Sequence, residues 1–145
     1  MITDIYSQLQ RDEGLRLSPY MDTVGKTTLG YGHNLDASPI SGLTFPITLD
    51  QALQILHEDV TRITAQLFKD IPWLEDLDSV RQGVFQNLAF NMGVGGVLEF
   101  HHDLEDTNAG NYVKAAADMK ASAWYTQVGV RAQRLCTQMA TGLWQ

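Results

Sequence analysis

One stretch of the chain, residues 15–34, has the residue pattern of β-strands, and it restricts the fold more than any other feature. Threonine, tyrosine and valine alternate there with turn-forming residues, and Gly25, Gly30 and Gly32 interrupt the run. β-branched and aromatic side chains favour strands, whereas glycines mark the tight turns between them. We therefore expect a small antiparallel sheet of two or three strands in a chain that is otherwise helical.

Apolar residues recur at helical spacing on both sides of this stretch. Residues 3–13 predict a short helix that Gly14 ends, because glycine readily adopts the left-handed conformation found just after a helix. Residues 48–70 predict a helix of about five turns. Thr48 is placed to cap that helix, with Gln51 at the reciprocal position of a capping box.

The remaining segments complete an α+β fold class. Proline, glycine and serine are frequent in residues 35–46, which predicts a loop. Further helices are expected at residues 77–91, 97–104, 112–120 and 128–140. We interpret the chain as a single domain, residues 1–145, with a β lobe (about 14–47), a linking helix (about 48–70) and a helical lobe (about 71–145, plus the helix at 3–13). A cleft between the lobes is the expected site.

Composition excludes several classes of protein. Seventeen acidic residues against ten lysines and arginines give a net charge of −7, and no basic block is present. Nucleic-acid binding needs clustered cations, so we expect no nucleic-acid partner. The single cysteine, Cys136, excludes an internal disulfide and a multi-cysteine zinc site. No apolar run approaches the roughly 20 residues of a membrane helix, and the N-terminus has no secretory signal pattern.

Three residues near the strand segment have side chains suited to glycoside hydrolysis. Glu13 lies in the last turn of a predicted helix, where carbonyl groups disfavour a negative charge, so we expect a raised pKa that suits a general acid. Asp22 precedes the turn at Gly25, and Thr28 alternates with Leu29 in a strand. Separately, they also fit a turn-initiating aspartate and a strand-forming threonine. Together they supply two carboxyl groups in different environments and a hydroxyl group.

The order of these residues closely resembles the catalytic segment of phage-type lysozymes, the endolysins of glycoside hydrolase family 24. The matching positions are Glu13, Gly14, Leu15, Arg16, Leu17, Tyr20, Asp22, Gly25, Thr28, Gly30, Gly32 and His33. The resemblance continues in residues 90–93, 122–125 and 141–144 and at Arg131 and Arg134, so it covers most of the chain.

The resemblance implies a lysozyme-like fold and a muramidase. Such an enzyme hydrolyses the β-1,4 bond between N-acetylmuramic acid and N-acetylglucosamine in peptidoglycan, its expected partner. By the resemblance, Glu13 is the general acid, Asp22 holds or activates the water and Thr28 positions it. Inversion at the anomeric carbon, also implied, requires carboxyl groups roughly 6.5–9.5 Å apart. No metal or organic cofactor is implied.

Further positions match supporting residues of the family. Arg131 matches an arginine that pairs with the catalytic glutamate, although a surface cation on a C-terminal helix is the alternative. His33 and Asp59 match a pair that joins the β lobe to the long helix and contributes stability. Gly30 and Gly32 are expected to admit sugar or backbone close to the sheet. Tyr31 either lines the cleft or packs as a strand aromatic. Asn91 is the last supporting position.

In two segments the properties of the family cannot simply be assigned to this chain. Residues 35–46 are shorter than the corresponding cleft-edge region of the family, so sugar contacts there are not transferred. The acidic and histidine residues of segment 99–106 suggest a metal site as one alternative and a polar loop as the other. Because adjacent residues rarely converge on one ion, we favour the polar loop.

We interpret the chain as a monomeric endolysin made in the host cytoplasm, which reaches the cell wall through a holin-type pore or another release route. Two alternatives stay open: a lytic transglycosylase, and a non-catalytic wall-binding or phage-structural module. Delivery on a phage tail or in bacterial warfare would use the same residues.

The acidic charge predicts an unusual salt dependence. Bacterial walls are anionic, so a chain with a charge of −7 is repelled by them at low ionic strength, and salt screens that repulsion. Clearing of chloroform-permeabilised Gram-negative cells should therefore be maintained or increased by moderate sodium chloride. A steep fall in the clearing rate as salt is added from low ionic strength would contradict this prediction.

Overall fold

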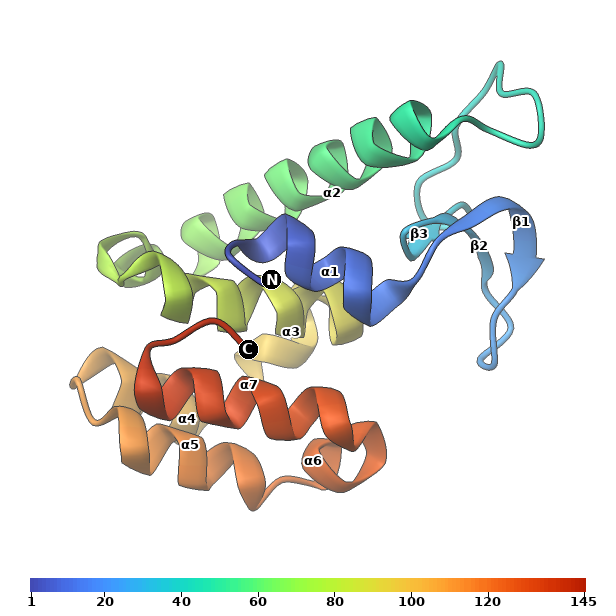
Figure 1. Cartoon of the computed structure of the whole chain (residues 1–145). Coiled ribbons are helices and arrows are strands. Elements are labelled where there is room, and N and C mark those ends of the chain that lie inside the picture. The colour runs from blue at the N-terminus through green and yellow to red at the C-terminus, as the bar shows by residue number, and fades with distance from the viewer. The chain divides into compact units, whose positions relative to one another are not determined.

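The computed structural model describes all residues, Met1–Gln145. It contains a three-stranded antiparallel sheet and seven α-helices, which confirms the predicted α+β class (Figure 1). The chain divides into two compact units. We call residues 6–62 the sheet unit, and residues 1–5 with 63–145 the helical unit. None of the helices combines the length and the apolar composition that crossing a membrane requires.

The sheet unit holds the predicted strands. Its elements are α1 (Ile5–Glu13), β1 (Arg16–Met21), β2 (Thr27–Gly30), β3 (His33–Asn34) and the first part of α2 (Leu49–Asp70). The strand order is β1-β2-β3, with Tyr20 opposite Thr28 and Leu29 opposite His33. Leu29 is fully buried, as are Leu9 of α1 and Ala52 of α2. The strands predicted within residues 15–34 are therefore confirmed.

The long helix α2 begins with the predicted capping box. The Thr48 hydroxyl accepts a hydrogen bond from the Gln51 amide at 3.1 Å, and the Gln51 side-chain oxygen accepts one from the Thr48 amide at 2.9 Å. These two bonds satisfy donors that the first turn of a helix otherwise leaves unpaired. The helix continues for 22 residues to Asp70, and a short 3-10 helix, η1 (Pro72–Asp76), follows it.

A buried histidine ties β3 to α2. His33 Nδ1 lies 2.7 Å from Asp59 Oδ2, and His33 Nε2 lies 2.7 Å from the carbonyl oxygen of Ser38. Both partners are acceptors, so both hydrogen bonds form together only when the imidazole is protonated and donates from both ring nitrogens. The hydrogen bond with Asp59 is the main cause that raises the pKa of His33, against the opposing effect of burial. Arg62 contacts the same aspartate through its other oxygen at 3.0 Å.

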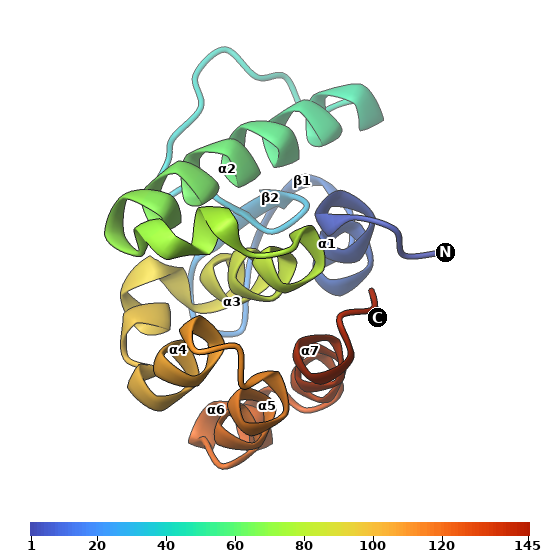
Figure 2. The same cartoon turned by 90° about the vertical axis from the view of Figure 1, so that its left-hand side faces the viewer.

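The helical unit contains more helices than the sequence patterns predict. Its elements are α3 (Ser79–Leu98), α4 (His101–Asn108), α5 (Tyr112–Lys120), α6 (Ala123–Val128) and α7 (Val130–Thr141), with η1 and the end of α2. Within this unit α7 packs against α3, α5 and α6, and α4 packs against α5 (Figure 2).

The predicted helix boundaries are correct for α5, lie within two residues of those of α7, and are wrong elsewhere in this unit. The helix expected at 77–91 continues to Leu98, although Gly93, with φ 81° and ψ 159°, breaks its regular geometry. The helix expected at 97–104 is wrong, because α3 ends at Leu98 and α4 begins at His101. Gly129, at φ 75°, separates α6 from α7, and the short α6 was missed because six residues carry little periodic signal.

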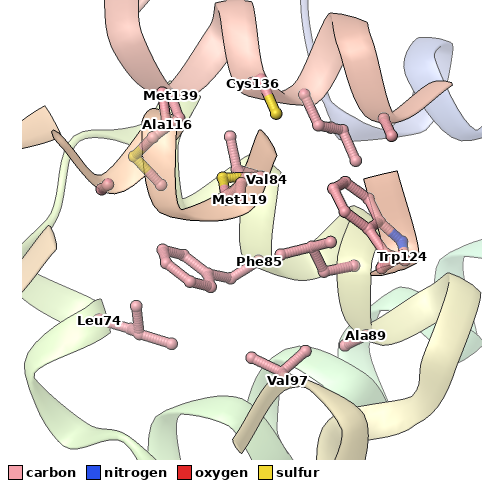
Figure 3. Close-up of a cluster of buried hydrophobic side chains, with 14 of the residues drawn as sticks. Leu74, Val84, Phe85, Ala89, Val97, Ala116, Met119, Trp124, Cys136 and Met139 are labelled. Atoms are coloured by element: carbon pink, nitrogen blue, oxygen red, sulfur yellow. The ribbon is translucent and has the colours of Figure 1, made fainter. Parts of the chain in front are cut away.

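The helices enclose one buried apolar core. Figure 3 shows Phe85 at its centre, among Val84, Met119 and Trp124. The Phe85 ring makes an edge contact with the Trp73 ring at 6.4 Å between centroids, a favoured aromatic geometry. Cys136 is part of this core, and burial raises the pKa of its thiol to about 11. The thiol is therefore neutral and unreactive at ordinary pH.

Three carboxyl groups lie together where α4 meets α5. Asp103 is 1% exposed, and its Oδ2 has no hydrogen-bond partner, while Oδ1 lies 3.3 Å from the hydroxyl of Thr107. Burial raises the pKa of Asp103 to about 7, and the charges of Asp118 and Asp106 act in the same direction. Asp118 shares a hydrogen bond with Asp106, which raises the pKa of Asp118 and lowers that of Asp106.

The first prediction from the fold concerns His33. Because its pKa in the folded protein lies above 6.5, the stability it contributes is complete below pH 6.5 and is lost as the pH rises through the raised value. His33→Asn leaves Asp59 without its buried partner, so unfolding at pH 5.5 should require about 3 kcal/mol less. Urea unfolding from pH 5 to 9 measures this, with His101→Asn, an exposed position on α4, as the control. An equal loss at pH 5.5 and pH 9 would show that the ion pair contributes nothing.

The second prediction from the fold concerns Asp103, whose pKa rises from 3.8 in the unfolded chain to about 7 in the folded protein. The folded state binds the extra proton, so the free energy of unfolding falls as the pH rises from about 4 to about 7, by at most about 4 kcal/mol. Asp103→Asn should flatten this part of the curve, measured by urea unfolding at each pH. The exposed substitution Asp50→Asn is the control, and an unchanged slope in Asp103→Asn would refute the assignment.

Candidate active site

The sheet unit positions Glu13 at the very end of α1. Gly14 ends this helix with a positive φ of 69°, and its amide donates to the carbonyl oxygen of Gln10 at 3.1 Å. The Glu13 side chain is half-buried and lies against the turn between β2 and β3. A β-carbon built on Gly32 would come within 2.5 Å of Glu13 Oε2. The carboxyl group is thus held beside the sheet, although 19 positions separate it from this glycine.

Asp22 is fixed by the hairpin loop between β1 and β2. Its Oδ1 accepts hydrogen bonds from the amides of Val24 at 3.0 Å and Lys26 at 2.8 Å, and its own amide donates to the Lys26 carbonyl oxygen at 2.9 Å. This is the geometry of a turn-initiating aspartate. The loop holds the carboxylate through one oxygen, which leaves Oδ2 available to accept a hydrogen bond from a water.

Thr28 lies on the central strand of the sheet. It is 5% exposed, and its hydroxyl donates to the carbonyl oxygen of Lys26 at 3.2 Å. With its proton used in this way, the hydroxyl oxygen is oriented as an acceptor. Asp22 directly follows β1 and Thr28 is the second residue of β2, so the two belong to one hairpin.

One residue of this site carries no signal in the sequence. Lys26 holds Asp22 through its amide and its carbonyl group, and the same carbonyl accepts from Thr28. All of these contacts use the backbone, so no side-chain type at this position could have indicated them. A residue that was also missed, Asp36, accepts a hydrogen bond from the Thr27 amide at 2.8 Å and so fixes the start of β2.

The structure brings most of the predicted supporting residues into the same unit. Gly30 packs over Ala52 of α2, where a β-carbon would lie at an ordinary contact distance of 3.8 Å. Tyr31 is 7% exposed, which favours the packed strand aromatic over a cleft-lining side chain. Gly32 and His33 make the contacts described above.

The two other predicted residues belong to the helical unit. Asn91 Oδ1 accepts a hydrogen bond from the indole nitrogen of Trp124 at 3.1 Å, and Arg131 Nε donates to Asn87 Oδ1 at 2.8 Å. Trp124 also lines a cavity of about 420 Å³ together with Met92. Asn91 therefore orients an aromatic ring at the edge of a cavity, a role that the sequence did not predict.

The histidine and acidic residues of segment 99–106 do not form a metal site. The structure contains no group of three or more histidine, cysteine, aspartate or glutamate side chains placed to hold a metal ion. Most of this segment is the helix α4, in which His101 and His102 are exposed while Asp103 is buried. Neither the metal site nor the polar loop is therefore found here.

The sheet unit contains the chemical groups that an acid–base reaction uses. Glu13 presents a carboxyl group at a helix end, Asp22 a carboxylate with one oxygen engaged by backbone amides, and Thr28 a fixed hydroxyl group. Two carboxyl groups in different environments can act as the acid and the base of one reaction. A hydroxyl oriented as an acceptor can hold a water in a defined direction.

Comparison with known proteins identifies the family of the chain. The family model of phage lysozymes matches residues 10–140. The pre-baseplate central spike protein Gp5 of Enterobacteria phage T4 is 33% identical over 92% of this chain, which spans 27% of the length of that protein. The probable T4-type lysozyme 1 of Dictyostelium discoideum is 28% identical, with 98% of this chain and 96% of that protein covered. The endolysin of Salmonella phage P22 is 34% identical over 77% of this chain and 75% of its own. The chain belongs to the phage lysozyme family.

Proposed function

We propose that this protein is a muramidase, which hydrolyses the β-1,4 bond between N-acetylmuramic acid and N-acetylglucosamine in bacterial peptidoglycan. The observation that carries the proposal is the constellation of Glu13, Asp22 and Thr28 within one compact unit of a phage lysozyme. Relatives named as lysozymes and endolysins support this activity.

Each of the three residues has a role that fits its contacts. Glu13, at the C-terminal end of α1, donates a proton to the leaving glycosidic oxygen. Asp22 accepts a hydrogen bond from a water through Oδ2, since its Oδ1 is occupied by two backbone amides. Thr28 holds the same water through its hydroxyl oxygen. Attack by this water on the anomeric carbon opposite the leaving group gives inversion.

Residues of the helical unit complete the proposal. Asn87 accepts a hydrogen bond from Arg131 Nε at 2.8 Å and so holds the guanidinium group in place. Asn91 and the adjoining Trp124 contribute to substrate binding, because the aromatic ring lines a cavity. Tyr31, Gly30 and His33 support the sheet from within.

For the biological role, we propose lysis of the host cell by a monomeric endolysin that is made in the cytoplasm and released to the wall through a holin-type pore. The endolysins of two phages among the relatives support this role. A specific observation favours a second candidate, a lysozyme carried on the phage particle, because the Gp5 relative is named as a baseplate spike protein.

The muramidase proposal predicts that Glu13→Gln loses activity. An amide cannot donate the proton that the leaving oxygen needs, so the clearing rate of chloroform-permeabilised Gram-negative cells should fall by at least about 100-fold. Mass spectrometry of the muropeptides released by the unmodified protein should show hydrated, reducing ends. Glu58→Gln, an exposed position on α2, is the matched control and should clear cells at the normal rate.

The same experiment separates the alternatives. Anhydro-sugar products that lack the added water would identify a lytic transglycosylase. If both folded proteins bind peptidoglycan equally and neither clears cells, the chain is a wall-binding or structural module, and the assignment of Glu13 is wrong.

A further inference from the structure

Two glycines in the turn between β2 and β3 have the same backbone conformation but different neighbours. Gly30 and Gly32 have φ values of +65° and +70°, a region that residues with a β-carbon rarely adopt. A β-carbon on Gly30 would meet only Ala52, at 3.8 Å, which is an ordinary van der Waals distance. The three atoms nearest to a β-carbon on Gly32 would all belong to the side chain of Glu13.

The contact at Gly32 is made with the carboxyl group itself. The added β-carbon would lie 2.5 Å from Glu13 Oε2, 2.8 Å from Cδ and 3.0 Å from Cγ. Optimal separations between nonbonded carbon atoms are about 3.5–4.0 Å, so the carboxyl group occupies space that any other residue would fill. The Glu13 carboxyl group can keep this position only because residue 32 has no side chain.

We propose that Gly32 is a positioning residue for Glu13: its missing side chain provides the seat in which the acid's carboxyl group rests beside the sheet. This inference rests on the proposed function, because it assigns Glu13 the role of general acid. It differs from the interpretation that the glycine leaves room for sugar, since the space above its α-carbon is already taken by the protein's own carboxyl group.

The position of this carboxyl group matters because proton donation depends strongly on geometry. A general acid must lie within hydrogen-bond reach of the leaving oxygen, about 2.6–3.2 Å. A β-carbon at residue 32 would push the carboxyl group roughly 1 Å away, and a misplacement of that size can reduce the rate about 100-fold. Gly32→Ala should therefore lower kcat rather than raise KM.

The test compares Gly32→Ala with a variant that imposes the same backbone strain elsewhere. Gly42 has a φ of +78° and no atom within 4 Å of its added β-carbon, so Gly42→Ala carries the strain without any collision. We expect Gly32→Ala to lower kcat about 100-fold on soluble peptidoglycan fragments and to move the limb of the pH–rate profile that reports the acid. Gly42→Ala should leave kcat, KM and the pH profile unchanged, although both variants unfold more easily.

The second part of the test shortens the acidic side chain at residue 13. In a Glu13→Asp protein the carboxyl group is one methylene closer to the helix, and the collision with residue 32 is reduced, because the atoms at 2.5 and 2.8 Å are no longer in those positions. Adding Gly32→Ala to Glu13→Asp should then cost at most a few-fold in kcat, compared with about 100-fold in the presence of Glu13. Equal costs in both proteins, or a rise in KM with kcat and the pH profile intact, would overturn the proposal.

Folding of the variant does not limit the experiment. If Gly32→Ala does not fold, the collision predicts that Glu13→Ala/Gly32→Ala folds again, because the colliding side chain has been removed. Failure of this double variant to fold would show that Glu13 is not what residue 32 must accommodate. If Glu13→Gln clears cells as fast as the unmodified protein, the proposed role of Glu13 as the general acid is wrong. The folding of the double variant still tests whether Gly32 makes room for the Glu13 side chain.

Discussion

The sheet unit depends on a buried hydrogen bond between a protonated imidazole and a carboxylate. His33 sits one residue beyond Gly32, and its contacts with Asp59 and the Ser38 carbonyl join the short strand β3 to α2 and to the following loop. A two-residue strand has little pairing of its own to hold it in place. Because removing His33 would leave one oxygen of the buried Asp59 without its partner, and Arg62 contacts only the other oxygen, this pair fixes the turn against which Glu13 rests.

Backbone groups carry much of the site's geometry. The two peptide groups around Lys26 hold one oxygen of Asp22 and the proton of Thr28, so a single loop conformation determines where the second carboxylate and the hydroxyl point. Hydrogen bonds from backbone amides to a carboxylate are strong and directional. The hairpin therefore fixes Asp22 and Thr28, whereas the position of Glu13 depends on the end of α1 and on Gly32.

The helical unit combines a stable apolar core with buried carboxyl groups that lower its stability. Its core is densely apolar around Phe85, yet the buried Asp103 has an oxygen without a hydrogen-bond partner, close to the charges of Asp106 and Asp118. An unsatisfied buried carboxyl group lowers stability when it ionises. Lys114, 3.3 Å from Asp106, offsets part of this repulsion. Acidic side chains are thus found both on the surface of the protein and between the packed helices α4 and α5.

Local patterns in the sequence determined the features that nearby residues decide. Alternation between residues 15 and 34 predicted the sheet, and the pair Thr48 and Gln51 predicted the start of α2, because both signals act over a few positions. The order of Glu13, Asp22 and Thr28 identified the family, since their spacing is a property of the chain itself. Short helices such as α6, and the junction at residues 99–100, were missed or misplaced because so few residues cannot establish a period.

The tertiary structure alone decided what distant segments do to one another. It placed the Glu13 carboxyl group over Gly32, bonded both nitrogens of His33 to acceptors, and buried Asp103 without a partner for one oxygen. Each of these facts depends on atoms from elements that are far apart along the chain or joined by an irregular turn. Residue types and spacing determine which chemistry is possible, but the protonation and exact position of a group follow from the atoms packed around it.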